Sequence, residues 1–124
     1  MSKMIYFKRR TLNGYRDKTT MNLNKSNQIA SLIEYQKDAV VSKTIIKKEK
    51  GTITVFAFDK EQGLSEHTAP FDALVQVLDG KADVIIDSES NIVLAGEMII
   101  MPANKPHALK AIEKFKMMLV MIRE

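Results

Sequence analysis

From about residue 39 to the C-terminus, apolar residues recur with the two-residue period of β-strands, and turn residues interrupt them every 8 to 12 residues or so. The strand-like runs are AVVSKTIIK (39–47) and TITVFAF (52–58), which are β-branched or aromatic, and then LVQVL (74–78), ADVII (82–86) and the apolar FKMMLVMI (115–122). Asp79-Gly80 is a strong signal for a two-residue hairpin, because both central residues of a type I′ turn have positive φ. Short strands joined by tight turns, with almost no helix, predict an all-β sandwich or barrel.

Charge is distributed unevenly along the 124 residues, a length that fits one domain. The net charge is +4, but residues 1–25 hold seven Lys or Arg against one Asp, while residues 26–124 hold twelve basic and fourteen acidic residues. We therefore predict a basic N-terminal extension (1–25) followed by a barrel domain (26–124). A basic arm can bind nucleic acid through phosphates, but base-stacking and groove-reading motifs are missing. A solvated extension, or translation from Met21, is favoured over nucleic-acid binding.

The sequence contains no cysteine, which excludes disulfides, thiolate nucleophiles and cysteine metal sites. No apolar run approaches the roughly 18 residues that cross a bilayer. The first residues, MSKMIYFKRR, lack the apolar core of a secretory signal. We expect a cytoplasmic protein without a membrane partner.

One segment near the C-terminus combines turn residues with a histidine at fixed spacing. It begins at Gly96 and reads GEMIIMPANKPH, ending at His107. Gly, five residues, Pro-x-Asn, two residues and His resembles the second motif of the cupin superfamily, except that Ala111 replaces the motif's final Asn. Cupins are double-stranded β-helical (jelly-roll) barrels, and the resemblance covers about residues 38–124. It therefore implies an all-β, jelly-roll cupin barrel.

The first cupin motif is only partly present upstream. In the family, two His and one Glu of this motif join the His of the second motif around a metal. Counting back from Gly80 places the two His positions at His67 and Ala69, and the Glu position at Ala73. Of the four ligands that the resemblance implies, His67 and His107 remain.

The residues that replace the missing ligands are apolar. Positions 67, 69 and 73 share one parity, so their side chains face one side of an extended chain. The residues predicted to line a ligand pocket on that side are His67, Ala69, Ala73, Val75, His107 and Phe56. A tightly held Zn²⁺ or Fe²⁺ takes three or four protein ligands, so a metal on His67 and His107 would need water, Asp72 or Gln76 to complete its coordination.

Three interpretations of His67 and His107 stay open. They are imidazoles bonded to the backbone or to each other, or polar anchors that bind a small organic ligand directly, or two ligands of a weakly held divalent metal ion. The methionines of the predicted strands are expected to pack the core rather than to bind Cu(I). Met117 and Met121 share a face by alternation, and Met118 takes the other face.

Both faces of ALVQVL (73–78) are apolar, although a closed barrel needs only an apolar interior. We expect its outer face to be covered by the N-terminal segment or by a second copy of the chain. A homodimer is favoured, and the resemblance to cupins, which commonly dimerise, agrees.

Fold alone does not determine function. The leading prediction is a small cupin that binds an organic ligand without a tightly held metal. The alternative is a metal-dependent isomerase, lyase or dioxygenase that uses His67 and His107 with an incomplete ligand set. A third hypothesis is an interaction module whose basic arm engages an acidic partner. The sequence leaves open whether the protein is an enzyme.

Overall fold

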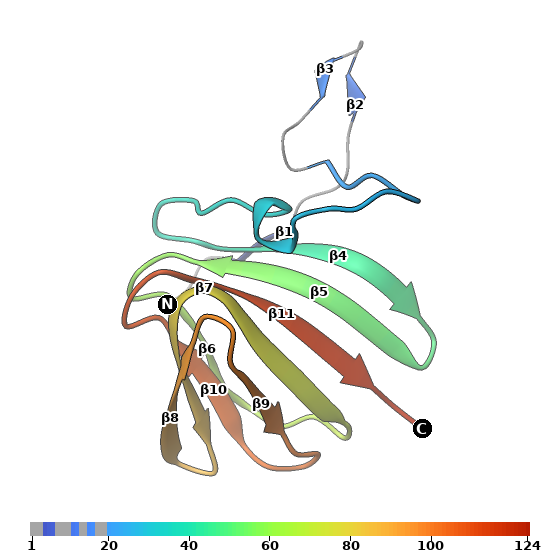
Figure 1. Cartoon of the computed structure of the whole chain (residues 1–124). Helices are drawn as coiled ribbons and strands as arrows, with labels where there is room; N and C mark the ends of the chain where they lie inside the picture. The colour runs from blue at the N-terminus through green and yellow to red at the C-terminus, as the bar shows by residue number, and fades with distance from the viewer. Residues whose placement is uncertain (1–3, 7–10, 13–14, 17–19) are drawn as a thin grey trace.

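The computed structural model describes residues 4–6, 11–12, 15–16 and 20–124, with side chains described from residue 20 onward. Within this part of the chain nearly all regular structure is β-strand (Figure 1). In chain order the elements are β1 (Met4–Tyr6), β2 (Thr11–Leu12), β3 (Tyr15–Arg16), the 3-10 turn η1 (Ile29–Ser31), β4 (Val40–Lys48), β5 (Gly51–Phe58), β6 (Gly63–His67), β7 (Asp72–Ile86), β8 (Glu89–Leu94), β9 (Met98–Met101), β10 (His107–Lys110) and β11 (Phe115–Ile122).

The strands form two curved layers that share the long strand β7. The first half of β7 pairs with β11 and β9, and its second half pairs with β10 and β8. The hydrogen-bonded path runs β1-β4-β5-β11-β7-β10-β6. This single sheet curls over itself into the jelly-roll barrel of Figure 1, which confirms the predicted fold class.

The hairpin predicted at Asp79-Gly80 is wrong, because β7 continues through both residues. Gly80 does adopt a positive φ of 76°. The pairing of β7 with β11 shifts register between Lys116 and Met117, as in a β-bulge, so the strand bends instead of reversing. A Cβ at Gly80 would overlap the carbonyl oxygen of Lys114, so the position also needs glycine for close backbone approach.

Two-residue hairpins occur elsewhere. Residues 49–50 join β4 to β5, where KKEKG predicted a connection, because Lys48 pairs with Gly51. Asp87 and Ser88 join β7 to β8 with φ values of 52° and 68°. Positive φ at both central positions is the signature of a type I′ turn, here without glycine.

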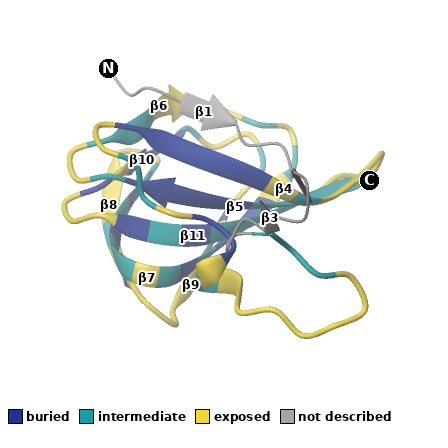
Figure 2. Ribbon diagram, turned by 90° about the horizontal axis from the view of Figure 1, so that it is seen from above, coloured by how far each residue is buried: buried dark blue, intermediate teal, exposed yellow. Residues whose placement is uncertain are grey.

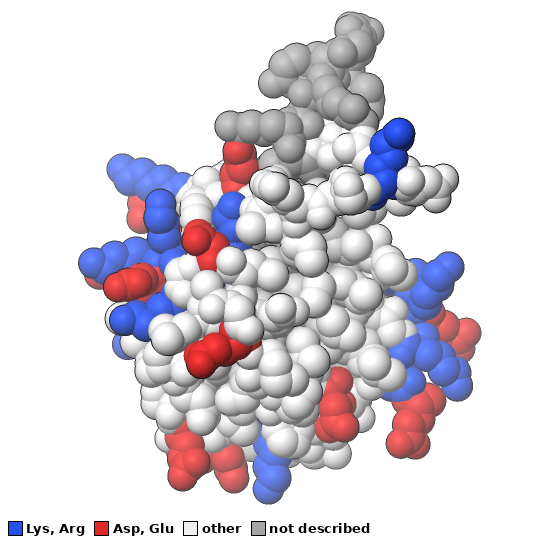
Figure 3. Space-filling view, viewed as in Figure 1, with Lys and Arg blue, Asp and Glu red and all other residues white. Residues whose placement is uncertain are grey.

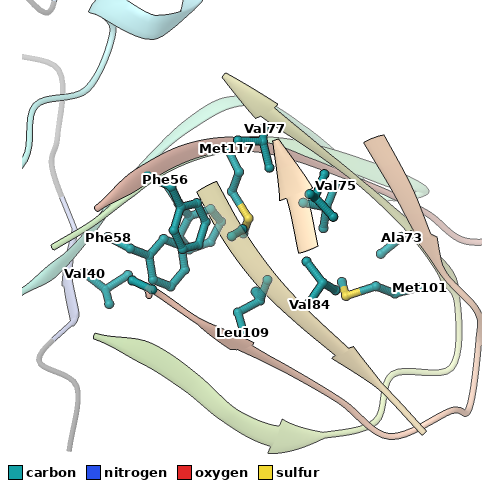
Figure 4. Close-up of a cluster of buried hydrophobic side chains, with 14 residues drawn as sticks. Val40, Phe56, Phe58, Ala73, Val75, Val77, Val84, Met101, Leu109 and Met117 are labelled. Carbon is teal, nitrogen blue, oxygen red and sulfur yellow. The ribbon is translucent and has the colours of Figure 1, made fainter. Parts of the chain in front are cut away.

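The barrel interior holds one continuous apolar core (Figure 4). Phe58 stacks on Phe115 with ring centroids 4.4 Å apart, and Phe56 stacks on Phe58 at 5.8 Å. Met117 is fully buried in this core, as expected of a packing methionine. The cluster comprises Val40, Phe56, Phe58, Ala73, Val75, Val77, Ala82, Val84, Val93, Met101, Leu109, Ala111, Phe115 and Met117.

A second apolar cluster lies on the outer face of β4, β5 and β11. Figure 2 shows much of β4 and β5 as buried. Residues 21–39 cover this face. Two hydrogen bonds tie this segment to the sheet: the Lys116 Nζ donates to the Ala30 carbonyl at 2.6 Å, and the Tyr35 hydroxyl donates to Asp79 at 2.5 Å. The cluster comprises Leu32, Ile33, Ala39, Val41, Val55 and Ala57, with Met118 packed against it. Part of the outer face is thus covered by a segment of the same chain.

The N-terminal residues contribute backbone pairing. Strand β1 pairs in parallel with β4, Met4 opposite Val40, and β2 pairs with β3. The basic side chains of the predicted extension (1–25), apart from Lys25, lie outside the described side chains, so the basic arm stays a prediction. Among the described residues, no helix has the length and apolarity needed to span a membrane.

Candidate functional site

The two histidines of the chain meet across neighbouring strands. Strand β6 ends at His67, β10 begins at His107, and the two residues are direct partners in the antiparallel pairing. Their ring centroids lie 4.4 Å apart, and the ring planes make an angle of 72°. The two Nε2 atoms face each other at 3.1 Å.

The pair lies where the barrel interior meets solvent. His107 is only 4% exposed, and Leu109, two residues further along β10, belongs to the barrel core. Strand alternation therefore points His107 inward. His67 is exposed, so a molecule that arrives from solvent reaches it first.

Both Nδ1 atoms lie against backbone carbonyl oxygens. The Nδ1 of His67 is 2.7 Å from the carbonyl oxygen of Ser65, and the Nδ1 of His107 is 3.1 Å from that of Lys105. Asn104, with φ 65°, donates its backbone N–H to the Ala69 carbonyl at 2.7 Å. That bond ties the loop before His107 to the segment after His67, and so helps to hold the two rings in register.

These contacts require more protons than two neutral imidazoles carry. A carbonyl oxygen only accepts hydrogen bonds, so each Nδ1 must carry a proton to bond there. A hydrogen bond between the two Nε2 atoms requires a third N–H, but two neutral rings supply two in total. With both Nδ1 atoms protonated, two Nε2 lone pairs converge. An added proton, a cation or a hydrogen-bond donor between them satisfies all the contacts.

The surroundings of His107 favour its neutral form. Burial lowers the pKa of His107 most, and nearby His67 lowers it further, while the hydrogen bond to the Lys105 carbonyl acts in the opposite direction. Since burial disfavours the charged ring, the net pKa lies below its ordinary value of 6.5. The Nε2 lone pair of His107 is therefore available at neutral pH.

This shift predicts that the protein loses stability as the pH falls below about 6.5. The unfolded chain protonates His107 near that pH, whereas the folded protein does so only at lower pH, so acid favours the unfolded state in this window. Urea unfolding measured between about pH 8 and pH 5 tests the prediction. His107→Gln should flatten the acid slope, and an unchanged slope in that variant would show that another group is responsible.

Comparison with known proteins identifies the family of this chain. The family model of the cupin domain matches residues 54–123, which is more than half of the chain and includes both histidines. The chain belongs to the cupin family. No curated protein sequence matches it.

Solved structures of this cupin's relatives give the same result. A conserved protein of unknown function from Streptococcus pyogenes is 35% identical, with a TM-score of 0.77, over 86% of this chain and 92% of that one. A cupin 2 conserved barrel domain protein from Leptotrichia buccalis is 41% identical, with a TM-score of 0.74, over 76% of this chain but 46% of that one. A cupin superfamily protein from Desulfitobacterium hafniense is 25% identical, with a TM-score of 0.79, over 84% of this chain and 95% of that one.

The other residues predicted to line the pocket of this cupin divide between two places. Ala73, Val75 and Phe56 lie in the barrel core. Ala69 is half-buried in the segment that follows β6, where its carbonyl binds the Asn104 backbone.

The two weak candidates for metal ligands lie on the outer side of β7. Asp72 alternates with the inward Ala73, and its Oδ1 accepts the backbone N–H of Ala103 at 2.9 Å. Gln76 pairs with Met118, which packs against the outer cluster, so Gln76 faces away from the barrel interior. Neither side chain shares the inward face of His107.

The donor set does not fit a tightly held metal ion. Among the described residues, no three His, Cys, Asp or Glu side chains are grouped so that they could hold one. Such an ion takes three or four protein ligands, and the histidine pair supplies two. No reaction step can therefore be assigned to a metal on these residues.

Two groups that define the site are backbone atoms, the carbonyls of Ser65 and Lys105. Sequence reasoning missed both, because a carbonyl has no side-chain signature. The sequence held one indirect signal for the position of the Lys105 carbonyl. Asn104 is one of the residue types that tolerate positive φ, and it marks the sharp loop that brings the Lys105 carbonyl back to His107.

Proposed function

We propose that this cupin binds a small organic molecule at the His67–His107 pair, with a protonated amine or similar hydrogen-bond donor of the ligand seated at the two Nε2 atoms. One observation carries the proposal: three close contacts involve the ring nitrogens, and two neutral rings supply only two protons. An ammonium group has three N–H donors and no acceptor, so it matches two converging lone pairs.

Apolar side chains beside the pair suit the rest of such a ligand. Ile86 is the direct strand partner of His107, and Leu64 pairs with Leu109 on β10. Ile86 and Leu64 are partly buried and pack against the barrel core. A site with few polar groups among apolar walls is typical of small-molecule binding. The preferred ligand is therefore a small amine with an apolar body.

A second candidate function uses a divalent metal ion, and the Nε2 separation favours it. Two imidazole nitrogens that bind one ion at about 2.0–2.1 Å, at adjacent positions, lie roughly 2.9–3.4 Å apart. The observed 3.1 Å falls in this range. Each Nδ1 also bonds a carbonyl, as metal-binding histidines commonly do. Water and ligand would have to supply the remaining coordination, so the ion would exchange readily.

Elemental analysis separates the two candidates. Untagged protein purified without chelator is compared with the His67→Ala, His107→Ala double variant. Substoichiometric metal, equal in both proteins, supports direct ligand binding. Near-stoichiometric metal that disappears in the double variant would overturn the first proposal and establish the second.

A single substitution tests whether the pair is the anchor. His67→Ala should weaken the binding of small primary amines about 10- to 100-fold, because it removes one hydrogen bond to a charged donor. Ligand-observed NMR titration measures the affinity. Thr68→Ala is the matched control, since Thr68 is the exposed neighbour on the same segment and should leave affinity unchanged. Equal affinity in the wild type and His67→Ala would place the ligand elsewhere.

A further inference from the structure

The inward face of the barrel is closed at one end and accessible at the other. Next to the bend of β7, the inward side chains of β5 and β11 include Phe58 and Phe115, which are fully buried. Further along β11, the inward Leu119 and Met121 are only partly buried. Figure 4 shows Phe58 at one end of the core and Met101 at the other. The accessible end is therefore the one where β5 begins and β11 ends.

Two rows of register partners lie opposite each other at this accessible end. Both layers contain β7, so counting outward from this shared strand sets β10 opposite β11 and β6 opposite β5 (Figure 1). The row on β7, β10 and β6 consists of Ile86, His107 and His67. The row on β7, β11, β5 and β4 consists of Ala73, Met121, Thr52 and Lys47. Ile86 and Ala73 lie about equally far from Gly80 along β7, so the two rows face each other.

The second row brings two polar side chains to the inward face. Ala73 belongs to the barrel core and Met121 packs against it, and direct register partners point their side chains to the same side of a sheet. The Thr52 hydroxyl on this face is buried, and it has no hydrogen-bond partner among the described residues. Lys47 lies beside Thr52 at the rim of the barrel and is exposed. We call these two residues the Lys47–Thr52 corner.

The chemistry of the Lys47–Thr52 corner suits an anion. Buried polar groups in folded proteins are nearly always hydrogen-bonded, so the unpartnered Thr52 hydroxyl indicates a partner supplied from outside the chain. The Lys47 ammonium group donates hydrogen bonds and accepts none, so the shared partner is an acceptor. Residues 47–50 read KKEK, three cations and one anion. Figure 3 shows Lys and Arg side chains, with acidic ones among them, at the edge of the molecule where β4 turns into β5. The local excess of positive charge attracts a negative group.

We propose that the Lys47–Thr52 corner binds a carboxylate, and that the ligand of this cupin is a short ω-amino acid. This assignment rests on the proposed amine site at the histidine pair, which faces the corner across the barrel. Stacked sheets lie about 10 Å apart, so an aliphatic chain of about four carbon atoms joins the two anchors once the His and Lys side chains reach inward. Ile86 and Met121, which are partly buried in the two rows, line the path of this chain.

Three compounds of equal chain length test the Lys47–Thr52 corner in ligand-observed NMR titrations: pentylamine, pentanoate and 5-aminopentanoate. The wild type should bind 5-aminopentanoate about tenfold more tightly than pentylamine, because the carboxylate adds charge-assisted hydrogen bonds. Lys47→Met and Thr52→Val should each remove most of this preference and leave the affinity for pentylamine unchanged. Lys48→Met is the matched control and should keep the preference, since Lys48 is the next residue and strand alternation turns it to the outer face.

Thermal unfolding checks that the variants are folded. Ligand-free Thr52→Val should be at least as stable as the wild type, because a methyl group replaces an unpartnered buried hydroxyl. Equal wild-type affinity for pentylamine and 5-aminopentanoate, or a preference that survives in Lys47→Met, would overturn the carboxylate site while the amine site stands. Pentanoate that binds the wild type more tightly than Lys47→Met, without any binding of pentylamine, would support the corner but overturn both the amine site and the ω-amino acid. Binding of none of the three compounds would overturn both sites.

Discussion

Phe58→Ala is expected to lower the free energy of unfolding by about 3–5 kcal/mol. Phe58 is fully buried in the barrel core, and its ring stacks on that of Phe115 and also contacts that of Phe56. Alanine removes this apolar area from the core and leaves a cavity that three strands surround and that cannot collapse easily. Urea denaturation at one fixed protein concentration measures the change.

Ile92→Ala is the control for this prediction, because Ile92 is an exposed apolar residue on β8. Its replacement should change the free energy of unfolding by about 0.5 kcal/mol or less. A decrease in the free energy of unfolding below about 1.5 kcal/mol for Phe58→Ala would contradict a tightly packed aromatic stack in the barrel core.

Gly80→Ala should destabilise the folded protein nearly as much as Phe58→Ala does. The substitution places a side chain at φ 76°, a conformation that costs a non-glycine residue on the order of 1–3 kcal/mol. The new Cβ also overlaps the Lys114 carbonyl oxygen, so β11 has to shift away from the bend of β7. We expect a total loss above about 3 kcal/mol in the free energy of unfolding.

Gly96→Ala separates the two causes. Gly96 has φ 90°, but an added Cβ would meet no atom within 4 Å. It should therefore cost only the conformational part, on the order of 1–3 kcal/mol. Thermal or urea unfolding of both variants gives the difference, and equal losses would contradict the close approach of β7 to β11.

The fold was predictable because strand signals are local. Period-two alternation identified β4, β5 and β11 directly, whereas β7 was predicted as two strands, LVQVL (74–78) and ADVII (82–86). The path of the chain at Asp79-Gly80 was not predictable from the dipeptide, since a glycine with positive φ serves a reversal and a bend equally well. What decides between them is the pairing of both halves of β7 with distant strands, which only the tertiary structure contains.

The meeting of the two histidines was predictable from the sequence, but the arrangement of their ring nitrogens was not. Motif spacing predicted that His67 and His107 belong to one site, and in the structure their Nε2 atoms are 3.1 Å apart. The converging lone pairs depend on two backbone carbonyls and on the positive φ of Asn104, none of which the motif encodes. Gln76 was a wrong candidate for a metal ligand. It lies near His67 in the sequence, but strand alternation turns its side chain to the outer face of the sheet.

We propose that the two imidazoles form one site that accepts a cation. Side-chain ¹⁵N NMR of both histidines at about pH 7.5, during titration with Zn²⁺ as the probe, tests this proposal. We expect both Nε2 signals to change together with one saturation point while both Nδ1 atoms stay protonated. A response from one ring alone, from neither ring, or from an Nδ1 atom would contradict it.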